Sequence, residues 1–192
     1  MKRTVALAVV LVFFAVVSCK RSEKQGDGLN DPATTTNATT QTSSSETAAQ
    51  TNVGTPMPEY AAVNLDGTKF DLAAKRDKVV LLNVWATWCG PCVYEIPELQ
   101  KLHEHYAPRG LEVVGVSVDE SGVESVRSFV AEQKKMTYPI VLDAEGKIAN
   151  ILQTSVLPTS IVVDRKGNIV WKKYGAIMPN DAELTKAIES AL

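Results

Sequence analysis

Cysteine, histidine and aromatic residues are all scarce in this 192-residue sequence. Three cysteines exclude a disulfide-framework protein, because at most one bridge can form and one cysteine is left over. Aromatic residues make up 6% of the chain, which argues against a large aromatic-lined ligand cleft. The formal net charge of −2 excludes a nucleic-acid binder that works through a basic surface. A hydrophobic content of 45% over this length suits one domain with a proper core plus an appendage.

The apolar run near the N-terminus is too short to span a membrane. It follows Lys2 and Arg3 and covers 14 residues from Thr4 to Val17, whereas a spanning helix needs about 20. A basic start, a short apolar run and a small residue at its end predict a secretory signal at residues 1–18. A retained membrane anchor is the weaker alternative, because the run is short.

One of the three cysteines, Cys19, directly follows this predicted signal. Ser18 directly before Cys19 resembles the lipobox of bacterial lipoproteins, which implies that Cys19 is acylated and becomes the first residue of the mature chain. An ordinary cleaved signal followed by an incidental cysteine is the alternative. The lipoprotein interpretation places the chain in the cell envelope, lipid-anchored and facing the periplasm or the cell exterior. Disulfides can form and persist there.

Residues 20–54 lack apolar periodicity. From residue 33 to residue 52 the chain is almost wholly Ala, Thr, Ser, Gln and Asn, so it cannot bury enough surface to offset its ordering entropy. As a flexible coil it would reach about 30 Å. We predict a lipidated N-terminus and disordered tether over residues 19–54, and a single domain over residues 55–192.

Strand and helix patterns alternate along that domain. Residues 79–85 and 111–118 are almost continuously apolar, which predicts strands buried on both faces. Apolar periodicity predicts helices at 93–106, 123–130 and 147–152, the second capped by Ser121 and Glu124. A short strand is expected at 138–142, hairpins around 65–68 and 165–168, and a last helix capped by Asn180 and Glu183. This order indicates an α/β domain with a mixed sheet covered on both faces.

The two remaining cysteines lie in the segment Trp88-Cys89-Gly90-Pro91-Cys92, where a buried strand ends and a helix begins. Unpaired N–H groups and the dipole at a helix N-terminus stabilise negative charge, so a thiol placed there has a lowered pKa. Cys89 is nearest the helix end and is predicted to be the attacking thiol. Cys92 follows on the same helical face, close enough to form a disulfide with it.

A zinc site or a structural disulfide could also account for this cysteine pair. A zinc site needs two further ligands, and the histidines, His103 and His105, point in different directions on one helix. We predict both as partly solvated helix residues, with no metal and no cofactor. A permanently closed bridge over so small a loop adds little stability.

The segment Trp85-Ala86-Thr87-Trp88-Cys89-Gly90-Pro91-Cys92, followed by Glu95, Pro97 and Leu99, resembles the thioredoxin superfamily. More narrowly, it resembles the membrane-tethered TlpA-like and ResA-like thiol-disulfide oxidoreductases. The resemblance covers residues 56–192. It implies a thioredoxin-like three-layer fold, with a mixed central sheet, helices on both faces, an N-terminal hairpin and an inserted strand-helix element within residues 121–143.

The resemblance also implies site residues. Leu157 and Pro158 match the family's cis-proline loop, which together with Trp88 would bind a substrate segment alongside the reactive cysteine. A trans proline at the strand entry is the alternative. Glu95 matches the glutamate of the tethered branch and would take the proton of Cys92, unless it is only a solvated helix residue.

The chain departs from the family pattern at one position. Asn83 stands where cytoplasmic thioredoxins carry a buried Asp on the strand that leads into the motif. Because an amide cannot relay a proton as an acid or base, that role must pass to Glu95 or to water.

The function implied is thiol-disulfide exchange, with Cys89 and Cys92 as the redox-active disulfide. The Gly-Pro pair between the cysteines favours a reductant. The expected partners are disulfide-containing envelope proteins, with apocytochrome c as a candidate client, and a membrane thiol-disulfide reductase as electron donor. The chain is expected to be a monomer without nucleic-acid partners. A peroxiredoxin-type peroxidase and a non-catalytic envelope binding protein remain as alternatives, although no cysteine has a Thr three residues before it.

Overall fold

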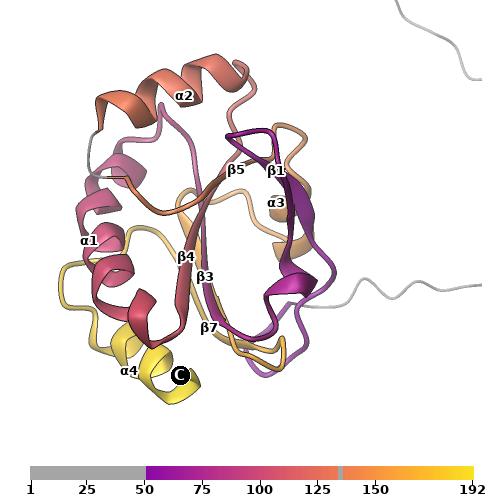
Figure 1. Cartoon of the computed structure of the whole chain (residues 1–192), viewed down its shortest axis with the longest axis vertical. Helices are drawn as coiled ribbons and strands as arrows, with labels where there is room; N and C mark the ends of the chain where they lie inside the picture. The colour runs from indigo at the N-terminus through magenta and orange to yellow at the C-terminus, as the bar shows by residue number, and fades with distance from the viewer. Residues whose placement is uncertain (1–50, 134–135) are drawn as a thin grey trace, which may run out of the picture. The chain divides into compact units, whose positions relative to one another are not determined.

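A computed structural model describes residues 51–133 and 136–192, which are built around a seven-stranded mixed sheet (Figure 1). The strand order is β2-β1-β5-β4-β3-β6-β7. β3 pairs with β4, and β4 with β5, in parallel, whereas the other neighbours are antiparallel. The strands are β1 (Ala61–Asn64), β2 (Lys69–Asp71), β3 (Val79–Trp85), β4 (Leu111–Ser117), β5 (Ile140–Leu142), β6 (Thr159–Val163) and β7 (Ile169–Tyr174).

The two central strands are buried along their whole length, as their continuous apolar sequence predicts. They lie in register, with Val79 opposite Leu111 and Trp85 opposite Ser117. Because they are parallel, their carboxyl ends meet at one edge of the sheet. The loop that leads to Cys89 starts at that edge.

Helices cover both faces of the sheet (Figure 1). α1 (Gly90–Tyr106), α2 (Val123–Glu132) and α4 (Ala182–Ala191) lie on one side, and α3 (Lys147–Leu152) on the other. Each face has its own buried core, one including Leu99 and Ile188 and the other Phe70 and Ile148. The predicted three-layer α/β architecture is confirmed.

The N-terminal hairpin and the inserted element meet in the sheet. β1 and β2 are joined by the predicted turn, in which Gly67 has a φ of +89° that suits glycine. The insertion contributes α2 and then β5, which lies between β1 and β4. Through this strand the hairpin becomes part of the main sheet.

The packed chain begins before the predicted domain boundary at Thr55. The side chain of Thr51 is buried and donates a hydrogen bond to the carbonyl of Ile151 at 3.1 Å. The N–H of Gly54 donates to the carbonyl of Ile169 at 2.7 Å. The signal peptide at 1–18, Cys19 and the tether up to residue 50 lie outside the described residues.

The capping box predicted for the helix after residue 122 is wrong. α2 starts after Gly122, which has a φ of +95°, and no side chain caps it. The hydroxyl of Ser121 lies 2.7 Å from that of Ser125, while Glu124 pairs with Arg127 at 3.5 Å. A glycine in the left-handed region turns the chain so that the Ser121 side chain faces the helix surface instead of its first N–H groups.

The cap of the last helix is displaced by one residue from the prediction. Asp181, not Asn180, accepts a hydrogen bond from the N–H of Leu184 at 3.0 Å. Asn180 instead has a φ of +61° and belongs to the preceding turn. Both residue types form caps and turns, so the sequence pattern alone does not separate the two positions.

Within the part of the chain that the structure describes, no helix is both long and apolar enough to cross a membrane. His103 is partly buried and His105 is exposed on α1, as predicted.

Candidate functional site

The two cysteines lie at the junction between the central sheet and α1. They form a disulfide, with their Cα atoms 5.3 Å apart. Cys89 is the N-cap residue of the helix, and its sulfur accepts a hydrogen bond from the N–H of Cys92 at 3.3 Å. Cys89 is 6% exposed and Cys92 1%. The more exposed cysteine is therefore the one at the helix terminus.

The start of α1 favours a negative charge on that sulfur when the bridge is reduced. Pro91 occupies the first turn, where its missing N–H is no loss, and the first turn contains no acidic residue. The unpaired N–H groups and the dipole of a 17-residue helix thus face Cys89 without a competing anion. A thiolate there is the nucleophile that thiol-disulfide exchange requires.

Glu95 is buried three residues after Cys92, on the same face of the helix. It is 1% exposed, so it is not the solvated residue of the alternative interpretation. Its two oxygens accept hydrogen bonds of 2.6 Å from the side-chain amide of Asn83 and the N–H of Ile177. Burial raises the pKa of Glu95 to about 7, because desolvation outweighs these hydrogen bonds and the attraction of Lys173. This carboxyl can therefore exchange a proton near neutral pH.

Asn83 connects the carboxyl of Glu95 to the sheet. Its amide nitrogen donates to Glu95 and, at 2.9 Å, to the hydroxyl of Ser160, its register partner on β6. An amide does not ionise in this range, so Glu95 is the carboxyl that this pair offers for proton exchange. The pKa of the buried Tyr138 is also raised, by desolvation first and by the charge of Glu95 second.

The Leu157–Pro158 peptide bond is cis, in contrast to the trans alternative. The loop leads directly into β6, whose first residue, Thr159, pairs with Val84 near the end of β3. The carbonyl of Pro158 accepts a hydrogen bond from the N–H of Gly175 at 2.8 Å. The loop is thereby held at the sheet edge where β3 ends.

Trp88 and Leu157 line one groove of about 260 Å³ at this edge. Trp88 is 71% exposed, although it is among the largest apolar side chains in the chain. Within the described residues, the backbone of Leu157 forms no hydrogen bond. The structure thus brings together, in one groove, the exposed ring of the residue directly before Cys89 and a backbone segment without hydrogen bonds.

Asp119 braces the loop before Cys89, a role that the sequence patterns did not predict. Its buried carboxylate accepts from the N–H of Thr87 at 3.0 Å, from the Thr87 hydroxyl at 2.6 Å and from the Ser117 hydroxyl at 2.8 Å. The available signal was an acid directly after a buried strand, at the edge where the neighbouring strand leads into the motif. An acid in that position can reach the adjacent loop.

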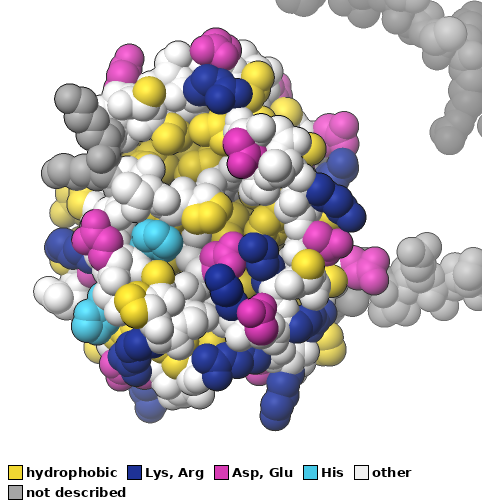
Figure 2. Space-filling view, viewed as in Figure 1, with side chains coloured by type: hydrophobic (Ala, Val, Ile, Leu, Met, Phe, Trp, Pro, Cys, Tyr) yellow, Lys and Arg dark blue, Asp and Glu magenta, His cyan; other side chains and the backbone are white. Residues whose placement is uncertain are grey.

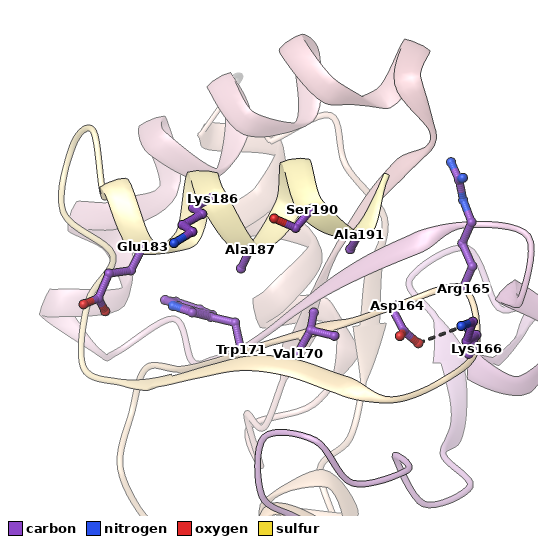
Figure 3. A pocket seen from close by; sticks show the side chains of 10 residues that line it. All are labelled: Asp164, Arg165, Lys166, Val170, Trp171, Glu183, Lys186, Ala187, Ser190 and Ala191. Atoms are coloured by element: carbon purple, nitrogen blue, oxygen red, sulfur yellow. Dashed lines mark hydrogen bonds between the residues drawn. The ribbon is translucent and has the colours of Figure 1, made fainter.

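A second groove, of about 650 Å³, lies between β7 and α4 (Figure 3). Trp171 and Val170 form its apolar floor, with Glu183 and Lys186 projecting from α4. Neither cysteine nor the cis-proline loop lines it, so it is separate from the redox site.

On the face drawn in Figure 2, acidic and basic side chains are interspersed.

Three comparisons with known proteins agree with this geometry. The model of the Redoxin family matches residues 52–188. The thiol-disulfide oxidoreductase ResA of Geobacillus kaustophilus is 34% identical over 131 residues, which are 68% of this chain and 74% of that protein. A ResA of Bacillus cereus is 33% identical over 123 residues, 64% of this chain and 70% of the relative.

Solved structures show the same fold. A thiol:disulfide interchange protein of the thioredoxin family from Chlorobium tepidum TLS superposes with a TM-score of 0.61 and 28% identity, covering 71% of this chain and 95% of that one. StoA from Bacillus subtilis superposes with a TM-score of 0.58 and 25% identity, covering 68% and 96%.

Proposed function

Since this chain belongs to the Redoxin family of the thioredoxin superfamily and is a thiol-disulfide oxidoreductase, we propose that it reduces protein disulfides outside the cytoplasm. One observation carries the proposal. The buried Glu95, whose pKa lies near 7, follows Cys92 on one face of the helix that Cys89 caps. A nucleophile, a resolving thiol and a proton acceptor are thus aligned along one helix terminus.

The first step is attack by the thiolate of Cys89 on one sulfur of a client disulfide. A Cys89–client bond forms, the client S–S bond breaks, and the released client thiolate takes a proton from solvent. The helix terminus stabilises the Cys89 thiolate before attack. This step does not require Glu95.

The second step is resolution by Cys92. Its thiol gives a proton to the Glu95 carboxylate and its sulfur attacks the sulfur of Cys89. The Cys89–Cys92 bond forms as the Cys89–client bond breaks, and the second client sulfur leaves as a thiolate that is then protonated. The client has gained two electrons from the two cysteines and two protons from solvent, and the proton of Cys92 remains on Glu95 until it is released to solvent. Its bridge is the one present in the structure.

Trp88, Leu157 and Pro158 would hold the client segment during both steps. The exposed ring of Trp88 offers apolar contact, and the backbone of Leu157 offers a strand-like hydrogen-bonding edge. The carbonyl of Pro158 is already bonded to Gly175, which fixes the edge in place.

The proposed location and partners of the chain follow from its N-terminal sequence and from its chemistry. Lipidation of Cys19 would anchor it to the envelope, with residues 20–50 as tether. Oxidised Cys89–Cys92 would be reduced again by a membrane thiol-disulfide reductase, because an oxidising compartment supplies no thiol reductant. The disulfide of an apocytochrome c before haem attachment is the client class we propose.

A trapping experiment tests this function. The Cys92→Ser variant of the full chain, reduced and mixed with a disulfide-containing apocytochrome c, should accumulate a mixed disulfide through Cys89 that is visible by mass spectrometry. The Cys89→Ser variant is the matched control and should accumulate none. Equal trapping by both variants, or none by either, would contradict the proposal.

Lipidation has its own test in cells. A chain with Cys19→Ala should lose both incorporation of labelled fatty acid and sedimentation with membranes, while the unchanged chain shows both. Membrane association without acyl label would overturn the proposed anchor.

A further inference from the structure

The groove beside Trp88 is lined by several loops at one edge of the sheet. The contributing segments are the ends of β3 and β4, the turn before α3 and the cis-proline loop. Its volume is about 260 Å³. We call it the Trp88 groove.

Apolar side chains that face solvent mark the Trp88 groove as a contact surface. Trp88 is 71% exposed and Val156 45%, although both are large hydrophobic residues. Three further exposed large apolar side chains, which do not line the groove, come from segments connected to the redox site through the chain, strand pairing or a hydrogen bond. Tyr94 follows Cys92 by two residues, Tyr174 pairs with Thr159, and Met178 follows the residue that bonds Glu95. Exposed apolar side chains in a groove that includes the residue directly before Cys89 indicate a surface that another molecule covers.

The charge on the rim of the groove is of one sign. Glu120 and Glu145 line it, and none of its lining residues is basic. The side chain of Glu145 is 77% exposed and pairs at 3.0 Å with Lys147, itself 60% exposed. A solvated pair of this kind is weak, so an incoming cation can compete for the carboxylate.

We propose that the Trp88 groove selects client segments that carry an aliphatic side chain and a Lys or Arg beside the disulfide cysteine. This inference rests on the proposed function, because it names the client chemistry of the same site. The aliphatic group contacts Trp88 and Val156, the cation lies between Glu120 and Glu145, and the client backbone pairs with Leu157. The occupant is an extended segment of a protein client.

The test compares peptides that differ only in charge. Three disulfide-bridged peptides of equal length place Lys, Gln or Glu at the two positions next to one cysteine. With the reduced full chain at low ionic strength, kcat/KM should fall in the order Lys, Gln, Glu, by about three- to tenfold between the first and the last. The gap should shrink in high salt, because exposed charges are screened.

Variants on the rim locate the effect. Glu120→Gln combined with Glu145→Gln should remove most of the preference for Lys. The matched control, Glu132→Gln combined with Glu183→Gln, changes exposed acids outside the groove and should keep it. A Val156→Ser variant should lower kcat/KM for peptides with Leu at the aliphatic position and leave those with Ser there unchanged.

A small uncharged linear disulfide, 2-hydroxyethyl disulfide, distinguishes failure of the groove proposal from failure of the proposed function. All rim variants should exchange with it at the rate of the unchanged chain. Equal rates for the three peptides, or a Lys preference that survives both rim substitutions, would overturn the groove proposal while leaving the oxidoreductase intact. Failure to exchange with any disulfide would instead overturn the proposed function.

Discussion

The side-chain amide of Asn83 donates a 2.6 Å hydrogen bond to the carboxyl of Glu95 inside the core. One residue comes from the central strand β3 and the other from the helix that begins at the redox site. Because the amide is neutral, it stabilises the Glu95 carboxylate only in part, and burial keeps the pKa near 7. With the N–H of Ile177, this amide lowers the pKa of Glu95 against the desolvation that raises it.

Glu95→Gln should slow resolution and leave the first attack largely intact. Glutamine keeps the shape of the side chain but cannot accept the Cys92 proton, so resolution near pH 7 should fall by on the order of 10- to 100-fold. Rapid-mixing kinetics with a disulfide peptide separates the two steps.

The matched control is Glu132→Gln, at an exposed position near the end of α2. It should leave both steps unchanged. Identical pH–rate profiles of both steps in Glu95→Gln and the unchanged chain would remove Glu95 from the mechanism.

Asn83→Ala should raise the pH midpoint of resolution. In the unchanged chain the hydrogen bond from Asn83 lowers the pKa of Glu95. Removing this bond therefore moves that pKa further upward, by about one pH unit. Ser160→Ala keeps the bond between Asn83 and Glu95 and should leave the midpoint in place. A midpoint that does not move in Asn83→Ala, as measured by resolution rates over the neutral pH range, would refute this assignment.

Stability should fall as the pH rises from about 4.5 to about 7. A carboxyl whose pKa is raised from 4.5 to about 7 on folding binds more protons in the folded state than in the unfolded state across that window. The free energy of unfolding of the oxidised chain should therefore decline by on the order of 3 kcal/mol and then level off. Urea unfolding at several pH values measures it.

The comparison that isolates this effect is the difference between the unchanged chain and Glu95→Gln. Because the variant has no carboxyl at this position, the decline should be absent from it. Stability curves that run parallel across the same pH window would contradict the raised pKa.

Asp119→Asn should slow attack by Cys89 as well as destabilise the fold. Losing the charged acceptor weakens its hydrogen bonds to Thr87 and Ser117, by about 1–3 kcal/mol in unfolding free energy. Since Thr87 lies two residues before Cys89, the position of the nucleophile should become less defined. Asp143→Asn changes another buried acid with two backbone N–H partners, and should lower stability without slowing attack on a small disulfide. Equal attack rates in both variants would show that Asp119 has only a structural role.

Elements with continuous patterns were predictable from the sequence. The strand at 79–85 and the short helix at 147–152 have the bounds expected from their apolar residues. Helix caps were not predictable from the sequence. Asn180 and Asp181 can both cap a helix, and which of them does so depends on the backbone path. The packing of Thr51 was also hidden, since its partner Ile151 lies 100 residues away and the surrounding composition is that of a tether.

At the redox site, the features that depend on neighbouring residues in the chain could be predicted from the sequence, whereas contacts between distant residues could not. The position of Cys89 at a helix start follows from one pentapeptide. The burial of Glu95 depends on Asn83 and on Ile177, 82 residues further along the chain, and no local pattern encodes the second contact. The brace from Asp119 to Thr87 likewise exists only because β3 and β4 are parallel neighbours.

The most direct measurement is the reduction potential of the Cys89–Cys92 couple in the full chain. Equilibration against dithiothreitol or glutathione, followed by the fluorescence of the exposed Trp88 beside the bridge, gives the value. A reductant fed by a membrane donor should have a potential near that of thioredoxin, about −270 mV. A value near about −120 mV would instead make the chain an oxidant of thiols and contradict the proposed direction of electron flow.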